Sequence, residues 1–149
     1  MINSASIINV SFLNMKEEVD QLVAGGTTFF HIDLMDGHYV PNLCLPIKML
    51  AELKAAYPQI TMDVHLMVTN PEDYVERLRE AGADYVSFHT DSTRFVRRVI
   101  NQIREAGMKP GILINPSQRI DHIEPYIEYV DMVTLMAVEP GFAGQPLLE

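Results

Sequence analysis

The feature that most constrains the fold is a regular alternation of short β-rich runs and helix-like segments. Four of the runs begin at residues 60, 84, 109 and 131, so that one unit spans about two dozen residues. Repeating βα units of this size predict parallel strands joined by right-handed crossovers. The predicted strands cover residues 5–10, 29–36, 60–68, 84–89, 109–115 and 131–138.

Helical spacing fills the intervals between these runs. Asn14 is the predicted N-cap of the first helix, and Asn70 followed by Pro71 opens the third, which Gly82 closes. The last helical stretch is limited by Pro125, because proline cannot continue a helix interior. The predicted helices cover residues 13–26, 46–57, 70–82, 93–107 and 117–127.

Two architectures fit this order of elements, an open doubly wound sheet and a (β/α)₈ barrel. The open sheet often carries a glycine-rich phosphate turn after its first strand, but the segment INVSFLNM contains no glycine. Polar residues recur instead near the carboxyl ends of several strands, as in the site of a barrel. These residues are Ser6, His31, Asp33, His65, His89 and Asn115. The pattern therefore favours an α/β TIM-barrel type of fold with about six of the eight βα units.

Composition excludes several classes of protein. The chain has 149 residues, the size of a single domain, with 11 basic against 20 acidic residues and a net charge of −9. This balance argues against binding nucleic acid, which usually requires a basic stripe. Cys44 is the single cysteine, so no disulfide forms within one chain and a cytoplasmic location is the simplest expectation. No apolar run approaches the ~20 residues of a membrane span.

The second and third predicted strands carry the strongest chemical signal. His31 and Asp33 are two residues apart and share one strand face, and His65 lies at a matching level on the next strand. Imidazole and carboxylate groups from neighbouring strands can hold a divalent metal. Spacing alone leaves this interpretation open beside a hydrogen-bonded structural pair. Met35 and Met67 continue the same faces, either as core residues or as an apolar wall over a substrate.

Two further features have both a functional and a structural interpretation. The loop EPGFAGQ, residues 139–145, can present backbone N–H groups to an anion, but it can also be only a turn. His89 ends its strand, where it either lines the mouth of the site or has a structural role. His122 lies in a helical stretch and is expected on the surface.

Five motifs together resemble the ribulose-phosphate 3-epimerase family. They are HIDLMDGHYVPN, DVHLMV, GADYVSFH, REAGMKPGILINP and MAVEPGFAGQP, and they follow the family order along essentially the whole chain. The resemblance implies a (β/α)₈ barrel that epimerises C3 of a ketose phosphate through an enediolate, in the pentose phosphate pathway. The implied cofactor is a divalent metal ion, Zn²⁺ first and Fe²⁺, Mn²⁺ or Co²⁺ as alternatives. A homo-oligomer acting on a small molecule is the expected assembly, without a nucleic-acid or membrane partner.

The resemblance also assigns roles to individual residues. His31, Asp33 and His65 match metal ligands, and Asp33 also matches one of two acid/base carboxylates. Ala5 stands where a proline is usual. Ala143 replaces the commoner glycine, a variant that is more similar to the allulose-6-phosphate 3-epimerase branch. The residues that match substrate contacts are Ser6, His65, Met35, Met67, Met136, Gly141, Phe142, Ala143 and Gly144.

The resemblance further implies that part of the barrel is missing from residues 1–149. In the family, the second acid/base carboxylate follows the seventh strand and the main phosphate-binding turns follow the seventh and eighth. We therefore expect a single, C-terminally truncated domain that does not close into a barrel alone and leaves its first and last strands as edges.

Three functions remain open from the sequence. The first is epimerisation of D-ribulose 5-phosphate to D-xylulose 5-phosphate, or of D-allulose 6-phosphate to D-fructose 6-phosphate. The second is a non-catalytic truncated relative that binds metal or sugar phosphate, or that serves as an assembly subunit. The third is another reaction on a phosphate-binding barrel, although the lack of an inward-facing lysine argues against a Schiff-base aldolase.

Overall fold

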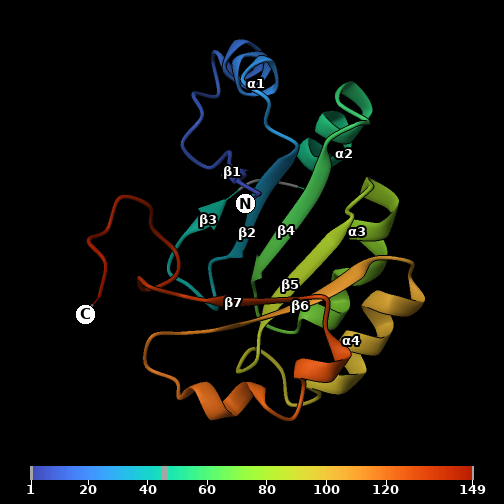
Figure 1. Cartoon of the computed structure of the whole chain (residues 1–149), viewed down its shortest axis with the longest axis vertical. Coiled ribbons are helices and arrows are strands. Elements are labelled where there is room, and N and C mark those ends of the chain that lie inside the picture. The colour runs from blue at the N-terminus through green and yellow to red at the C-terminus, as the bar shows by residue number, and fades with distance from the viewer. Residues whose placement is uncertain (1, 45–46, 149) are drawn as a thin grey trace.

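In the computed structural model, which describes residues 2–44 and 47–148, a curved sheet forms the centre of the molecule (Figure 1). Six parallel strands follow one another in the order β1-β2-β4-β5-β6-β7, and the short β3 pairs antiparallel with β2. Among the described residues, β1 and β7 do not pair with each other, so the sheet stays open with these two strands at its edges. The strands are β1 (Ser4–Ser6), β2 (Phe29–Asp36), β3 (Leu43–Cys44), β4 (Thr61–Met67), β5 (Tyr85–His89), β6 (Lys109–Ile114) and β7 (Met132–Leu135).

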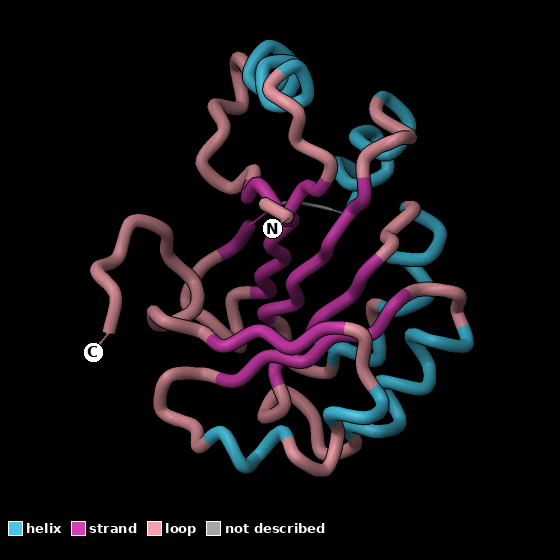
Figure 2. The backbone as a smooth tube through the Cα atoms, viewed as in Figure 1, coloured by secondary structure: helices cyan, strands magenta, loops and turns pink. Residues whose placement is uncertain are grey.

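Helices cover one side of the sheet, as Figure 2 shows. Alternate residues of the strands point to this side and pack with apolar helix residues in one continuous core, Ile32 of β2, Val64 of β4 and Phe88 of β5 among them. The α-helices in the described part of the chain are α1 (Met15–Ala24), α2 (Ile47–Ala56), α3 (Val75–Ala81) and α4 (Val96–Glu105). The six parallel strands and their outer helices confirm the predicted partial barrel.

Helix α4 shows why the sequence specifies these elements. Its four buried residues, Val96, Val99, Ile100 and Ile103, recur at spacings of three and four and form one apolar stripe. Burying each of these side chains stabilises the fold by roughly 1.5–3 kcal/mol. Arginine, asparagine and glutamine occupy most of the other positions. No helix among the described residues is both long and apolar enough to cross a bilayer.

The other face of the sheet carries the polar residues. His31 and Asp33 of β2 lie on this face, as do Asp63 and His65 of β4. The register pairs Asp33 with His65 and Met35 with Met67. This confirms the prediction that His65 lies at the same height in the sheet as the polar residues of the neighbouring strand. Within residues 2–44 and 47–148, the buried polar or charged side chains all lie on this inner face: Asp33, Asp63, His65, Ser87 and His89.

Several predicted element bounds were wrong. Residues 117–127 contain no α-helix; a 3₁₀ turn at Ile120–Ile123 precedes Pro125, and another at Ile127–Tyr129 follows it. Asn70 has φ 53° and its side chain makes no capping hydrogen bond with the described residues, and a 3₁₀ turn at Pro71–Asp73 precedes α3. The strands β1 and β7, which lie at the edges of the sheet, are shorter than predicted. Pro46, the first residue of the predicted second helix, lies outside the described residues.

Candidate functional site

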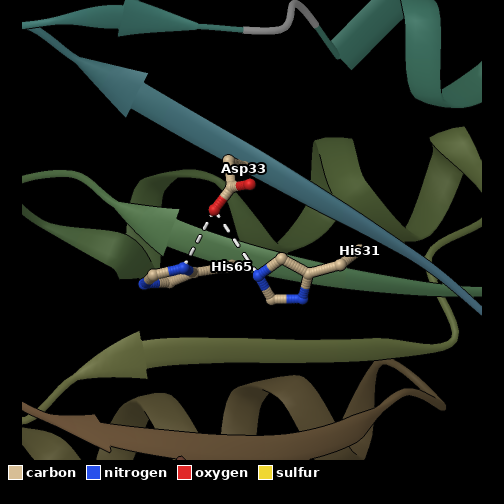
Figure 3. Close-up of side chains that lie close together, drawn as sticks. All are labelled: His31, Asp33 and His65. Atoms are coloured by element: carbon tan, nitrogen blue, oxygen red, sulfur yellow. Dashed lines mark hydrogen bonds and ion pairs between the residues drawn. The ribbon is translucent and has the colours of Figure 1, made fainter. Parts of the chain in front are cut away.

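Three side chains from neighbouring strands meet on the inner face of the sheet (Figure 3). His31 and Asp33 come from β2, and His65 comes from the adjacent β4. One ligand atom from each of the three residues lies within 4.8 Å of the others. The structure therefore brings together the three residues that the sequence predicts as metal ligands.

Asp33 is the centre of this cluster. Its Oδ1 lies 3.1 Å from Nδ1 of His65 and 3.4 Å from Nε2 of His31. Its other oxygen, Oδ2, accepts a hydrogen bond of 3.0 Å from the Ser6 hydroxyl on β1. Three strands thus hold one carboxylate, and each group that contacts it belongs to a residue of the sheet.

Asp63 supports His31 from the side away from Asp33. Its Oδ2 lies 2.8 Å from Nδ1 of His31 and accepts a weaker hydrogen bond, 3.3 Å long, from Ser4. A carboxylate on the second ring nitrogen fixes the orientation and tautomer of a metal-binding histidine. The sequence places Asp63 two residues before His65, on the same strand face, but does not assign it this role.

His89 lies beside His65, two residues beyond the Ser87 that pairs with His65 in the sheet. Its side chain is fully buried, and its Nε2 lies 2.9 Å from Nε2 of His65. His122, in contrast, is exposed, as expected.

The charges of the cluster follow from its hydrogen bonds. Burial lowers the pKa of His31, but hydrogen bonding to Asp33 and Asp63 outweighs burial and raises it to about 10. Burial raises the pKa of Asp33, but the adjacent rings of His31 and His65 more than compensate, so the pKa lies well below its usual range. Burial lowers the pKa of His65. Burial and the neighbouring His65 lower the pKa of His89 to about 3. At neutral pH, Asp33 is therefore an anion beside a cationic His31.

A cavity of about 200 Å³ opens above the cluster. This volume is below the roughly 300–1,000 Å³ of pockets for drug-sized ligands, so it suits a smaller molecule. Every predicted site residue lines this cavity except Gly144. Gly144 lies in the open, since a Cβ atom built there would have no neighbour within 4 Å in the described part of the chain. The lining also includes residues that sequence reasoning missed. These are Ile8, Thr134 and Val138, and the lining also contains Glu139 and Pro140 of the predicted anion-binding loop.

Methionine side chains form part of the cavity wall. Met35 and Met67 are 6% and 2% exposed and pack with Val40 in a small cluster apart from the main core. Met136 lies just after the end of β7 and lines the cavity from the opposite edge of the sheet. These side chains offer an apolar surface without an acid or a base.

Two loops meet across the cavity. The Asn42 amide nitrogen donates a hydrogen bond of 2.8 Å to the Gly141 carbonyl, 99 residues further along the chain. Gly141 has φ +112°, and a Cβ there would lie 3.0 Å from Cβ of Val40. Only glycine adopts this backbone conformation without strain and allows so close an approach. The loop after β7 is thus fixed against the loop after β2.

The donor set fits a divalent metal ion. Two imidazole nitrogens and one carboxylate oxygen are ligands that Zn²⁺, Fe²⁺, Mn²⁺ and Co²⁺ all accept. The candidate ligand atoms His31 Nε2, His65 Nδ1 and Asp33 Oδ1 face one another, and Asp63 supports His31 from behind. Asp33 thereby offers both a ligand oxygen and a carboxylate that can accept a proton.

Comparison with known proteins supplies the family. The model of the ribulose-phosphate 3-epimerase family matches residues 2–149.

The chain belongs to this family.

Curated relatives named ribulose-phosphate 3-epimerase agree with this assignment. The protein of Buchnera aphidicola from Schizaphis graminum is 35% identical over 145 residues, which are 97% of this chain and 64% of the relative. The protein of Methanocaldococcus jannaschii is 38% identical over 97% of this chain and 60% of its own length. The protein of Bacillus subtilis is 36% identical over 96% of this chain and 65% of its own length. The chain thus spans less than two thirds of the length of these family members.

Solved structures support the fold. The 3-keto-L-gulonate-6-phosphate decarboxylase of Vibrio cholerae superposes with a TM-score of 0.62 at 12% identity, covering 87% of this chain and 58% of that chain. The tryptophan synthase α subunit of Legionella pneumophila gives a TM-score of 0.61 at 12% identity, over 91% of this chain and 62% of its own. At this identity the likeness concerns the fold alone.

Proposed function

We propose that the protein serves the epimerisation of a ketose phosphate at C3, with D-ribulose 5-phosphate as the substrate and a divalent metal ion as the cofactor. The observation that carries the proposal is the position of Asp33. It is ionised, it lies between two histidines of a candidate metal site, and it lines the cavity. Membership of the family and the names of the relatives support the reaction and the pentose substrate.

The proposed chemistry begins with proton removal. The C3 proton lies next to the C2 carbonyl and is weakly acidic, and Asp33 is a base in the correct ionisation state to accept it. Residues His31, Asp33 and His65 would hold the metal ion, which supplies Lewis-acid stabilisation of the negative charge that develops on the sugar oxygens. Inversion also requires a proton donor on the opposite face of C3.

The cavity walls would protect the deprotonated sugar. Met35, Met67 and Met136 line the cavity with apolar surface, which excludes water and supplies no competing acid. The loop carrying Gly141, Phe142 and Ala143 borders the same cavity and is the proposed contact for the phosphate end. Ser6 would keep Asp33 oriented through its hydrogen bond to Oδ2.

Solvent exchange at C3 tests the role of Asp33 directly. The 149-residue chain, loaded with Zn²⁺, Mn²⁺ or Fe²⁺, is incubated with ribulose 5-phosphate in D₂O, and the C3 proton signal is followed by NMR. We expect exchange, and we expect Asp33→Asn to slow it by at least about 100-fold, the usual contribution of a general base. Xylulose 5-phosphate formation is measured in the same samples, because it also requires the second proton donor.

The control is Asp121→Asn, which removes an exposed carboxylate that forms an ion pair with Arg119 and should leave exchange unchanged. Allulose 6-phosphate is assayed in parallel, and faster exchange with it would reassign the substrate to the hexose phosphate. Metal binding without exchange of either sugar would overturn the catalytic proposal in favour of a non-catalytic binding protein.

A further inference from the structure

His89 is a buried titratable residue that the proposed reaction does not use. It ends β5, it is 0% exposed, and its ring packs against Tyr39 with ring centroids 4.9 Å apart. Its Nε2 lies 2.9 Å from Nε2 of His65. Two imidazole nitrogens at this distance share one proton, so one ring donates and the other accepts.

The direction of this hydrogen bond determines what His65 can bind. In Figure 3, Nδ1 of His65 faces Asp33 and its other nitrogen points away. A neutral imidazole carries a proton on one nitrogen and a lone pair on the other. Coordination of a cation through Nδ1 therefore requires the proton on Nε2, which then donates to His89.

Asn115, a neighbour of His89, favours the hydrogen bond in which Nε2 of His65 donates and Nε2 of His89 accepts. If Nε2 of His89 accepts, then its Nδ1 carries a proton and needs an acceptor. Among the described residues, Nδ1 of His89 and Oδ1 of Asn115 are both buried, and neither makes a hydrogen bond of standard geometry. Asn115 is nevertheless close enough to act on His89 through its side chain. The two unsatisfied atoms are thus a matched donor and acceptor.

The orientation of the Asn115 amide is fixed by its other partners. Its Nδ2 donates to the Tyr39 hydroxyl at 2.8 Å and to Oδ2 of Asp91 at 3.1 Å. The Tyr39 hydroxyl in turn donates to Oδ1 of Asp91 at 2.7 Å. A carboxylate only accepts hydrogen bonds, so the amide nitrogen must face Asp91. This leaves Oδ1 of Asn115 as an acceptor for His89.

We propose that His89, oriented by Asn115, holds His65 in the tautomer that leaves Nδ1 free to bind a divalent cation. His89 is then a positioning residue, acting through His65 and touching neither metal nor sugar. The inference rests on the metal site of the proposed function and is independent of the sugar and of the reaction.

The first test measures zinc affinity by competition with a chromophoric chelator. His89→Leu removes the acceptor for Nε2 of His65 and should raise the Kd for Zn²⁺ by about 10–100-fold, the usual effect of losing such a partner. His89→Gln keeps an acceptor oxygen and should restore most of this loss. An equal affinity for Zn²⁺ in His89→Leu and the unsubstituted chain would overturn the proposal. So would equally weak Zn²⁺ binding by His89→Leu and His89→Gln.

The matched control is Phe88→Leu on the same strand. Phe88 is also 0% exposed, but it belongs to the core on the opposite face of the sheet. Its truncation should lower the midpoint of urea unfolding without changing the Kd for Zn²⁺. A parallel loss of zinc affinity in this variant would assign the effect of His89 to packing.

The second test needs no substitution. In the zinc-loaded chain with ¹⁵N-labelled histidine, long-range ¹H–¹⁵N spectra report which ring nitrogen carries each proton. We expect the proton on Nε2 of His65 and on Nδ1 of His89. A proton on Nδ1 of His65 would overturn the inference even in an active protein. The expected tautomer without C3 exchange would instead overturn the proposed reaction alone, and a chain that binds no zinc would overturn the inference together with the metal site.

Discussion

At Asp33, groups from three strands converge on one carboxylate. The Ser6 hydroxyl donates to Oδ2, and the rings of His31 and His65 approach Oδ1. Against the opposing effect of burial, the contact between Asp33 and His31 lowers the pKa of Asp33 and, together with Asp63, raises that of His31 to about 10, because a cation and an anion stabilise each other in a buried site. Metal binding by His31 must therefore displace a proton.

The raised pKa of His31 predicts a pH dependence of stability in the metal-free chain. His31 titrates at 6.5 as an isolated group and at about 10 in the fold, so its stabilising contribution is complete below pH 6.5 and is lost as the pH rises through 10. We expect the excess stability of the unsubstituted chain over His31→Gln to fall by more than about 1.4 kcal/mol across this window. Urea unfolding with EDTA at pH 6, 8 and 10 measures it, and a constant difference would contradict the prediction.

Asp63 provides a second prediction at the scale of the residue. Its Oδ2 accepts from Nδ1 of His31, which leaves Nε2 towards Asp33. Asp63→Asn weakens the orientation of His31 and should raise the Kd for Zn²⁺ by about 10-fold or more. Ser4→Ala removes only the long hydrogen bond to Asp63 and is the matched control, with little expected change. Equal loss in both variants would contradict a specific role of the carboxylate on His31.

At the scale of the element, the strands supply the site and the loops close it. β2 and β4 present their polar residues in register, whereas the loop after β7 reaches the cavity through Asn42 and Gly141. The strand residues are fixed by ladders on both sides. The loop depends on a few contacts, so its order is expected to respond to single substitutions.

Asn42→Asp tests the contact between the two loops. Asn42 also accepts a hydrogen bond through Oδ1 from the Leu43 amide, which aspartate retains, while the donor to the Gly141 carbonyl is lost. We expect faster hydrogen exchange confined to residues 139–145 and a loss of about 1 kcal/mol of local stability. Unchanged exchange in this segment would show that the Asn42 hydrogen bond does not order it.

At the scale of the whole molecule, the curved sheet is open. β4 and β5 have strand neighbours on both sides and nearly continuous burial, whereas β1 and β7 lie at the edges. The edge β7 is partly exposed along its length and ends at Leu135, which is 57% exposed. Unpaired edges and exposed apolar side chains make the outer strands the least protected part of the core.

Hydrogen exchange followed by mass spectrometry tests this order of stability. Backbone amides of β4 and β5 are expected to exchange most slowly, at rates set by global unfolding. Amides of β1 and β7 should exchange at least about 10-fold faster, through local opening at the edges. Uniform protection across the sheet would contradict the prediction and would indicate that the edges are covered in solution, for example by a second copy of the chain.

The sequence by itself determined the order of the βα units and the positions of the candidate metal-binding residues along their strands. Period-two alternation places His31, Asp33 and His65 on one face, and a repeat of about two dozen residues requires parallel strands, so these inferences depend only on local geometry. The 3₁₀ turns around Pro125 and the left-handed Asn70 escaped prediction, because local propensities there yield to packing.

Tertiary structure alone decided how the partners of the ligands are arranged. The carboxylate of Asp63 behind His31, the contact of His89 with His65, and the hydrogen bond from Asn42 to Gly141 join residues 24 to 99 positions apart. No local pattern encodes such distances, because they depend on strand register and on the curvature of the sheet. The sequence therefore specifies which groups face inward, and the fold determines which of their atoms meet.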